Sequence, residues 1–249
     1  MIPRSFIDYP IAHRAFHDKA AGRPENSLAA IRAAIDEGYG IEIDLQLSKD
    51  GVAMVFHDYS LTRLTGENGP IAQRTAAELA RMTLLGGDEG VPTLAEVLAT
   101  VDGKVPLLIE IKDQDGALGP NIGALEAATA ETLKGYSGPV ALMSFNPHSI
   151  AKMAELLPEV PRGLTTCNYA AEDWPTIPAA TREALRGIPD YERTGSCFVS
   201  HQHTDLADPR IAELKANGAN ILCWTIRSTE AEKAAREIAD NVTFEGYRA

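Results

Sequence analysis

Short apolar stretches alternate with segments of helical periodicity along most of the chain. Residues 27–37 place Leu28, Ile31 and Ile35 on one face, at the spacing of an α-helix. Strands are expected at 9–13, 39–45, 106–112, 140–145, 160–165, 196–202, 220–226 and 241–244, and helices at 27–37, 121–134, 148–157, 178–187, 208–217 and 228–238. This alternation predicts a parallel sheet covered by helices.

Eight such strands in 249 residues predict a single domain over residues 1–249, a (β/α)8 barrel of the TIM type. An Asp50-Gly51 turn joins the second strand to a further apolar run at 52–58, as in a hairpin. Residues 59–104 then interrupt the alternation, so we expect a small insertion there. No helical pattern follows the last strand, so the eighth helix is expected to be absent or supplied by another segment. An open doubly wound sheet is the alternative, but no GxGxxG follows the first strand.

Charge and cysteine usage narrow the choice of partners and compartment. The formal net charge of −12 repels phosphate backbones, so neither nucleic acid nor an anionic membrane is an expected partner. Cys167, Cys197 and Cys223 are far apart and form no CxxC, which favours a reducing compartment over a disulfide framework. No stretch reaches the roughly 20 apolar residues of a membrane span, and no secretory leader is visible. We therefore expect a cytoplasmic protein without stable membrane insertion; a homo-oligomer stays open.

Acidic residues lie within two of the predicted strands. Glu42 and Asp44 are two positions apart, as are Glu110 and Lys112, so each pair shares one face of its strand. Buried carboxylates without partners are costly, and a hard divalent cation such as Mg²⁺ or Ca²⁺ would remove that cost. Taken singly, each pair is more typical of a surface face or an ion pair than of a metal site. Their occurrence at successive strand ends favours one metal site at the barrel mouth.

Histidines also follow predicted strands. His13-Arg14 ends the first strand and His57-Asp58 ends the hairpin partner of the second, so their imidazoles are candidates for proton transfer near neutral pH. Asp58 is expected to orient His57 or to cap a turn. His201 and His203 follow the sixth strand, where we favour contact with substrate, or simple solvation, over a zinc site.

Two aromatic residues at strand ends have two interpretations. Phe145 and Trp224 are expected either to form an apolar wall for the organic part of a substrate, or to pack in the core.

In combination these residues resemble the glycerophosphodiester phosphodiesterase family, over nearly the whole chain and in the family's order. The matching motifs are His13-Arg14, Pro24-Glu25-Asn26-Ser27, Glu42-Ile43-Asp44, Lys49-Asp50-Gly51, Val55-Phe56-His57-Asp58, Pro92-Thr93-Leu94, Glu110-Ile111-Lys112, Ser144-Phe145 and Trp224-Thr225. Three departures stand out: Ser27 replaces a Thr, Arg227 stands where an Asn is common, and residues 243–249 replace a Thr-Asp followed by Pro. The last two bear on substrate preference more than on the chemistry.

The resemblance implies roles for individual residues. Glu42, Asp44 and Glu110 would bind one divalent cation, Mg²⁺ or Ca²⁺. His13 and His57 would be the acid–base pair, and Arg14 and Lys112 would hold the phosphate.

The implied reaction is metal-dependent hydrolysis of small glycerophosphodiesters, such as glycerophosphocholine or glycerophosphoethanolamine, to glycerol 3-phosphate and an alcohol. The nucleophile is either the glycerol 2-hydroxyl or a water molecule, and the sequence does not assign the acid and the base. A phospholipase D-like activity on lysophospholipids or sphingomyelin is the alternative, but it needs an apolar entrance, and no aromatic-rich exposed loop is visible in the sequence. A silent binding protein is disfavoured by the retention of all these groups.

Overall fold

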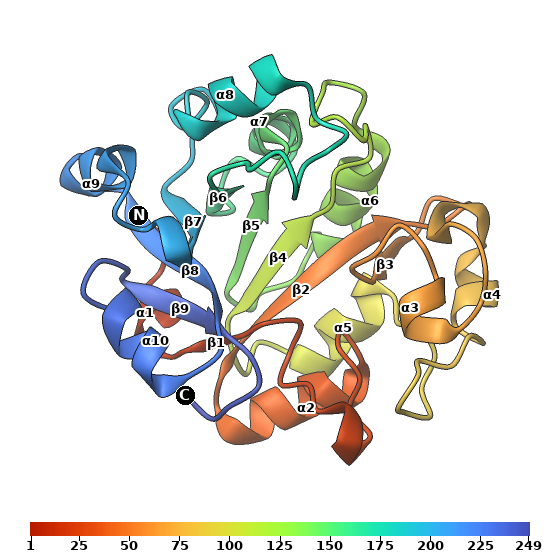
Figure 1. The fold of residues 1–249 in the computed structure, drawn as a ribbon. Helices are drawn as coiled ribbons and strands as arrows, with labels where there is room; N and C mark the ends of the chain where they lie inside the picture. The colour runs from red at the N-terminus through yellow and green to blue at the C-terminus, as the bar shows by residue number, and fades with distance from the viewer.

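The computed structural model describes residues 1–249, which form a closed ring of parallel strands surrounded by helices (Figure 1). The strand order is β1-β9-β8-β7-β6-β5-β4-β2, and β1 also pairs with β2, which closes the barrel. The strands are β1 Ile11–Ala12, β2 Gly40–Leu47, β3 Ala53–Val55, β4 Leu107–Ile111, β5 Val140–Ser144, β6 Arg162–Thr166, β7 Phe198–Gln202, β8 Asn220–Ile226 and β9 Asn241–Phe244. The predicted TIM barrel is confirmed, and the closing pairs exclude the open sheet.

The helices alternate with the strands as the periodicity predicted. They are α1 Ser5–Asp8, α2 Leu28–Glu37, α3 Thr62–Thr65, α4 Ala76–Leu79, α5 Leu94–Val101, α6 Ala124–Leu133, α7 Pro147–Leu156, α8 Ala179–Arg186, α9 Pro209–Ala216 and α10 Thr229–Ala235. Ser27 caps α2 as expected, because its hydroxyl accepts a hydrogen bond from the Ala30 N–H at 3.1 Å. None of these helices has the length and apolar character needed to cross a bilayer.

Apolar side chains pack in two layers, one on the outer face of the barrel sheet and one inside the barrel. Alternate side chains of the strands, such as Ile41 and Ile43, pack outward against the helices. The inward-facing apolar side chains form a smaller cluster that includes Leu108 and Leu222. Phe6 of α1 joins this inner cluster and is fully buried. The interior is therefore filled with apolar groups below the carboxyl ends of the strands, and the polar inward-facing residues gather at those ends.

The segment after β2 begins with a hairpin. β3 pairs antiparallel with β2, and Gly51 in the connecting turn has a φ of +81°, which glycine adopts without steric cost. Residues 52–91, which include α3 and α4, build a small apolar core of their own around Met54 and Phe56. Figure 1 shows this segment beside the end of β2.

Helix α5 lies within residues 59–104, the range predicted as the insertion. It begins at a capping box, in which the Thr93 hydroxyl accepts from the Glu96 N–H at 3.2 Å and the Glu96 carboxylate accepts from the Thr93 N–H at 2.8 Å. It packs against α2, β3 and α6. Helix α5 therefore belongs to the ring around the barrel, whereas β3, α3 and α4 form the extra segment.

No helix follows β9 in residues 245–249, which run across the seam between β9 and β1. Tyr247 packs against Phe244, with ring centroids 5.4 Å apart, and Arg248 pairs with Glu37 at the end of α2. The His13 N–H donates to the Phe244 carbonyl at 2.8 Å. The residue after Phe244 is thereby held next to the end of β1.

Gly163 on β6 lies where two strands approach closely. A Cβ at this position would lie 2.5 Å from both the Phe198 ring and the Phe198 carbonyl oxygen. We expect Gly163→Ala to lower the free energy of unfolding by about 1–3 kcal/mol, because the backbone of β7 cannot move aside. Urea unfolding measures the change. Gly187→Ala is the matched control, because its Cβ would make only an ordinary 3.5 Å contact; equal losses in the two variants would contradict this explanation.

Candidate active site

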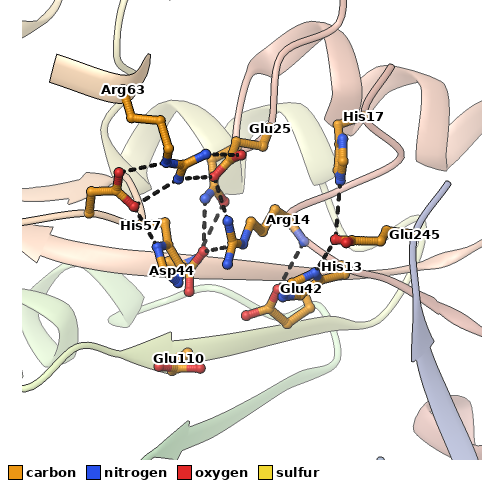
Figure 2. Close-up of polar contacts among 12 residues, drawn as sticks. His13, Arg14, His17, Glu25, Glu42, Asp44, His57, Arg63, Glu110 and Glu245 are labelled. Atoms are coloured by element: carbon orange, nitrogen blue, oxygen red, sulfur yellow. Dashed lines mark hydrogen bonds and ion pairs between the residues drawn. The ribbon is translucent and has the colours of Figure 1, made fainter. Parts of the chain in front are cut away.

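Three carboxylates converge at the carboxyl ends of β2 and β4. Asp44 is the register partner of Glu110 on the neighbouring strand, and Glu42 lies on the same face two residues earlier. Ligand oxygens of all three lie within 4.8 Å of one another. All three residues are buried: Glu42 and Asp44 are each 1% exposed, and Glu110 is 6% exposed. Figure 2 shows them near the two histidines, with Glu110 on the neighbouring strand. The structure therefore brings together the three acids expected from the sequence.

The neighbouring cations compensate this charge unevenly. Lys112 Nζ lies 2.7 Å from both Asp44 Oδ1 and Glu110 Oε1, whereas Glu42 forms no ion pair and accepts only the Arg14 backbone N–H at 2.9 Å. Burial raises the pKa of Glu42 well above its usual value, and the charges of Asp44 and Glu110 raise it further. Burial also opposes ionisation of Asp44, but Lys112 and the other nearby cations outweigh it and hold the pKa of Asp44 well below its usual value.

This donor set fits a hard divalent cation. All three side chains offer oxygen ligands, they are buried together, and one of them lacks a counter-charge. The group could therefore hold one divalent cation.

The loop between β1 and α2 is shaped around the carboxylates. Arg14 and Asn26 both have positive φ, 54° and 59°, and the Asn26 N–H donates to the Arg14 carbonyl at 2.9 Å. Asn26 is one of the few residue types that tolerate this conformation. Its side-chain amide donates to Asp44 Oδ2 at 2.9 Å, and the loop directs the Arg14 N–H at Glu42. This turn also explains why β1 ends at Ala12, before the predicted limit.

His57 is held by a carboxylate–arginine chain. Its Nδ1 lies 2.7 Å from Asp58 Oδ1, and Arg63 of α3 donates from Nε to Asp58 Oδ2 at 2.7 Å. Arg63 also donates to Glu25, which accepts from Arg14 Nη1 at 2.8 Å (Figure 2). Burial raises the pKa of Asp58, but its bonds to His57 and Arg63 outweigh burial and hold it well below the usual value. Asp58 thus orients His57, as expected, whereas Arg63 was not predicted.

His13 is held in a similar way from the other end of the chain. Its Nδ1 lies 2.5 Å from Glu245 Oε2, and Arg227 donates from Nε to Glu245 Oε1 at 2.8 Å. His17 Nε2 lies 3.6 Å from the same carboxylate. Burial outweighs the hydrogen bond to Glu245, which acts in the opposite direction, so the pKa of His13 lies below its usual value. Sequence reasoning marked Glu245 and Arg227 only as departures from a family pattern and missed their contact with His13.

Two adjoining cavities open at the mouth. The smaller, of about 170 Å³, is lined by His13, Arg14, Glu42, His57, Glu110, Lys112, Met143, Phe145, Thr165, Trp224, Thr225, Arg227 and Thr243. The larger, of about 860 Å³, shares five of these residues, His57, Glu110, Lys112, Phe145 and Trp224. His57 therefore borders both cavities, and His13 borders the smaller one alone.

Phe145 and Trp224 form part of an aromatic wall. The Phe145 ring centroid is 5.6 Å from that of Trp224 and 4.9 Å from that of Trp174, which lies in the segment after β6. The Trp224 Nε1–H donates to the Ser200 carbonyl at 3.0 Å. Leu118 and Ile177 extend this wall along the larger cavity. Both predicted aromatics therefore face the mouth while packing against their neighbours.

The substrate-contacting interpretation of His201 and His203 is wrong. His201 faces outward from β7, where its Nδ1 lies 2.7 Å from the Thr166 hydroxyl and its Nε2 lies 3.4 Å from Asp205 Oδ2. His203 begins a short 3₁₀ helix, and neither histidine lines either mouth cavity. Gln202 is the residue at this strand end that borders the larger cavity. The sequence left open which alternate residues of β7 face into the barrel, and in the structure Gln202 faces inward while His201 faces outward.

Known proteins share both the sequence pattern and the barrel. The model of the glycerophosphoryl diester phosphodiesterase family matches residues 13–242. A glycerophosphodiester phosphodiesterase of Caldanaerobacter subterraneus subsp. tengcongensis is 28% identical over 244 residues, covering 93% of this chain and 91% of that protein. An Oleispira antarctica phosphodiesterase, solved in complex with the product sn-glycerol-3-phosphate, is 27% identical with a TM-score of 0.75, covering 97% of this chain and 94% of the other.

A glycerophosphodiester phosphodiesterase structure from Thermotoga maritima, 24% identical, shares the fold with a TM-score of 0.70 over 95% of this chain and 94% of the other. The fold, the family match and the relatives together define this protein as a phosphoric diester hydrolase. The chain belongs to the glycerophosphoryl diester phosphodiesterase family. The resemblance seen in its motifs is confirmed.

The charge imbalance at Glu42 gives a stability test. Because its pKa is raised in the folded state, Glu42 contributes stability below the pKa of an unfolded glutamate, and this contribution is lost as pH rises through the folded pKa. In EDTA at pH 8 we expect Glu42→Gln to unfold at a temperature about 2–4 °C above that of the wild type. Mg²⁺ or Ca²⁺ should raise the midpoint of the wild type but not that of the variant.

Differential scanning calorimetry measures both effects. Glu131→Gln, on the exposed face of α6, is the control and should keep the response of the wild type to cations. A wild-type midpoint that is identical in EDTA, Mg²⁺ and Ca²⁺ would contradict the cation site.

Proposed function

We propose that this enzyme hydrolyses small glycerophosphodiesters to glycerol 3-phosphate and an alcohol such as choline or ethanolamine. The observation that carries the proposal is the pairing of His13 and His57 at one small cavity, each with Nδ1 engaged by a carboxylate and Nε2 left free. Two histidines so placed can divide the proton transfers of a substitution at phosphorus. The glycerol 3-phosphate complex of the Oleispira antarctica relative supports this substrate class.

The basic residues of the site serve the phosphate. A phosphodiester is anionic and repels nucleophiles, so neutralising it lowers the barrier. Arg14 and Lys112 both line the small cavity, where a guanidinium can bind two phosphate oxygens and an ammonium acts as a point charge. Glu42, Asp44 and Glu110 would hold one divalent cation, Mg²⁺ or Ca²⁺, which when bound supplies further neutralisation of the phosphate.

The two cavities suggest how the substrate lies. The glycerol phosphate occupies the smaller cavity, beside His13, and the alcohol extends past His57 into the larger one, along Phe145 and Trp224. In this orientation His13 acts as the general base, and His57 as the general acid, in the first half of the reaction.

The reaction then proceeds in two halves. His13 Nε2 takes the proton of the glycerol 2-hydroxyl, whose oxygen bonds to phosphorus while the bond to the alcohol oxygen breaks, and His57 gives that oxygen a proton. In the second half His57 takes a proton from water, the water oxygen bonds to phosphorus, and the ring bond to the glycerol 2-oxygen opens. His13 then returns its proton to that oxygen, so both histidines end in their starting states.

The larger cavity supports a second candidate, a phospholipase D-like activity on lysophospholipids or sphingomyelin. Its wall contains Leu118, Trp174 and Ile177 from the segments after β4 and β6, an apolar surface that was not visible in the sequence. In the reverse orientation, with the acyl chain in the larger cavity, such a lipid would bury apolar area there that a short alcohol cannot. Small diesters remain the favoured substrates, because the polar cavity between the histidines has only about 170 Å³.

An assay panel tests the substrate and the cation together. We expect release of glycerol 3-phosphate from glycerophosphocholine and glycerophosphoethanolamine, loss of turnover in EDTA, and recovery with Mg²⁺ or Ca²⁺, because the buried carboxylates need a cation. Coupled glycerol 3-phosphate dehydrogenase measures the product. Lysophosphatidylcholine and sphingomyelin test the second candidate by choline release. Turnover that persists unchanged after exhaustive chelation would reject the cation requirement.

The histidine roles predict different responses to the leaving group. His13→Ala and His57→Ala should each reduce kcat with glycerophosphocholine by about 10²–10⁴. With glycerol phospho-p-nitrophenol, whose p-nitrophenolate departs without a proton, His57→Ala should regain most of the lost rate of the first half-reaction, while His13→Ala should not. Pre-steady-state release of p-nitrophenolate measures this step.

His148→Ala, at the start of α7 and outside both cavities, is the matched control for the loss of an imidazole. Recovery of His13→Ala instead of His57→Ala would reverse the assignment, and high activity in either variant with glycerophosphocholine would refute it.

A further inference from the structure

Glu245 lies at the seam where the barrel closes, directly after β9. Its Oε2 lies 2.5 Å from His13 Nδ1, although the two residues are 232 positions apart. The backbone fixes this approach, because the His13 N–H donates to the Phe244 carbonyl at 2.8 Å and the Glu245 N–H donates to the Ile226 carbonyl at 2.9 Å. Glu245 is therefore held on both sides by the neighbouring strands, with its carboxylate beside His13.

The second oxygen of Glu245 is held separately. Arg227, which follows β8, donates from Nε at 2.8 Å and lies with Nη2 at 2.7 Å from Oε1. The Glu245 side chain is only 18% exposed, whereas that of Arg227 is 65% exposed. An exposed ion pair alone contributes little, but here it fixes the orientation of a half-buried carboxylate whose other oxygen faces an imidazole.

The same arrangement occurs at His57, from unrelated parts of the chain. There the carboxylate is the adjacent residue, Asp58, and the arginine is Arg63 of the extra segment. Each histidine of the small cavity thus has a carboxylate at Nδ1 and an arginine behind that carboxylate. Figure 2 shows Glu245 beside His13 and Arg63 near His57. At His13 the two supporting residues, Glu245 and Arg227, directly follow β9 and β8.

We propose that Glu245 is a positioning residue for His13, with Arg227 fixing Glu245 in turn. The carboxylate accepts a hydrogen bond from Nδ1–H, which fixes the ring and the tautomer that leaves the lone pair of Nε2 towards the small cavity. This inference rests on the proposed role of His13 as a base. The charged and titratable groups around His13 are Glu245, Arg14 and Asp44, with His17 and Arg227 beyond Glu245.

Substitutions at Glu245 test the proposal. Glu245→Gln and Glu245→Ala should lower kcat with glycerophosphocholine by about 10²–10³, with KM within about threefold of the wild type, because the proton transfer is affected and substrate contacts are kept. Arg227→Met should lower kcat less, by about tenfold. Formate is a small carboxylate that can take the space left in Glu245→Ala. Adding it should raise the kcat of this variant at least tenfold.

A spectroscopic measurement reports on the ring without relying on activity. In ¹H–¹⁵N spectra of the imidazoles, with His13 assigned from His13→Ala, the wild type should show protonated Nδ1 and unprotonated Nε2 near pH 8. Glu245→Gln should shift His13 towards the other tautomer. Glu37→Gln is the matched control: it breaks the other glutamate–arginine pair of the C-terminal segment, with Arg248, away from His13, and should change neither kcat nor the spectrum.

The outcomes separate the two proposals. If His13→Ala is inactive while Glu245→Gln keeps more than a third of the wild-type kcat, or keeps the His13 tautomer, the positioning role is wrong and the proposed function stands. If His13→Ala is itself active, the assignment of the base fails. A loss in Glu245→Ala that formate does not reverse, with an unchanged His13 spectrum, also overturns the positioning role.

Discussion

The mouth of this barrel is organised by the repulsion among three carboxylates buried side by side. Asp44 and Glu110 are register partners on adjacent strands, so β2 and β4 cannot separate their charges without breaking the sheet. Lys112 reaches these two and leaves Glu42 with a single backbone N–H. The loop after β1, left-handed at Arg14 and Asn26, directs the Arg14 N–H at Glu42 and the Asn26 amide at Asp44. Three buried oxygen donors with incomplete charge compensation suit a divalent cation.

Around this centre the chain uses arginine–carboxylate pairs to fix its two histidines. At His57 the pairs continue from Asp58 through Arg63 to Glu25 and Arg14, which ties the extra segment to the loop after β1. Charge-assisted bonds of this kind are directional, so they hold the segment in a defined orientation above the mouth. The segment has its own apolar core around Met54, and both the ionic chain and the Tyr59 hydroxyl, which donates to the Asp113 carbonyl at 2.7 Å, connect its surface to the site.

The two cavities at the mouth have different chemistry because different elements build them. Residues at the carboxyl ends of the strands, and those that follow them within two positions, line the smaller cavity, which is therefore polar and held by the sheet. The segments after β4 and β6 line much of the larger one and contribute Leu118, Trp174 and Ile177. Loops vary without disturbing a barrel, so the proposed phosphate chemistry and the proposed selection of the alcohol fall on separate parts of the structure.

The sequence by itself determined the features that depend on local periodicity. Alternation of strands and helices predicted the barrel, and the two-residue repeat placed Glu42 and Asp44 on one face, to be joined by Glu110. The same local patterns did not reveal that α5 belongs to the ring, or that His201 faces away from the mouth, because both depend on the phase and packing of whole elements.

Contacts between distant segments were decided by the tertiary structure alone. Glu245 meets His13 only because β9 pairs with β1, and Arg63 reaches Asp58 only because the extra segment folds back over β2. Neither closure of a barrel nor the path of a loop is written in the spacing of neighbouring residues, since each follows from the register in which remote strands pair.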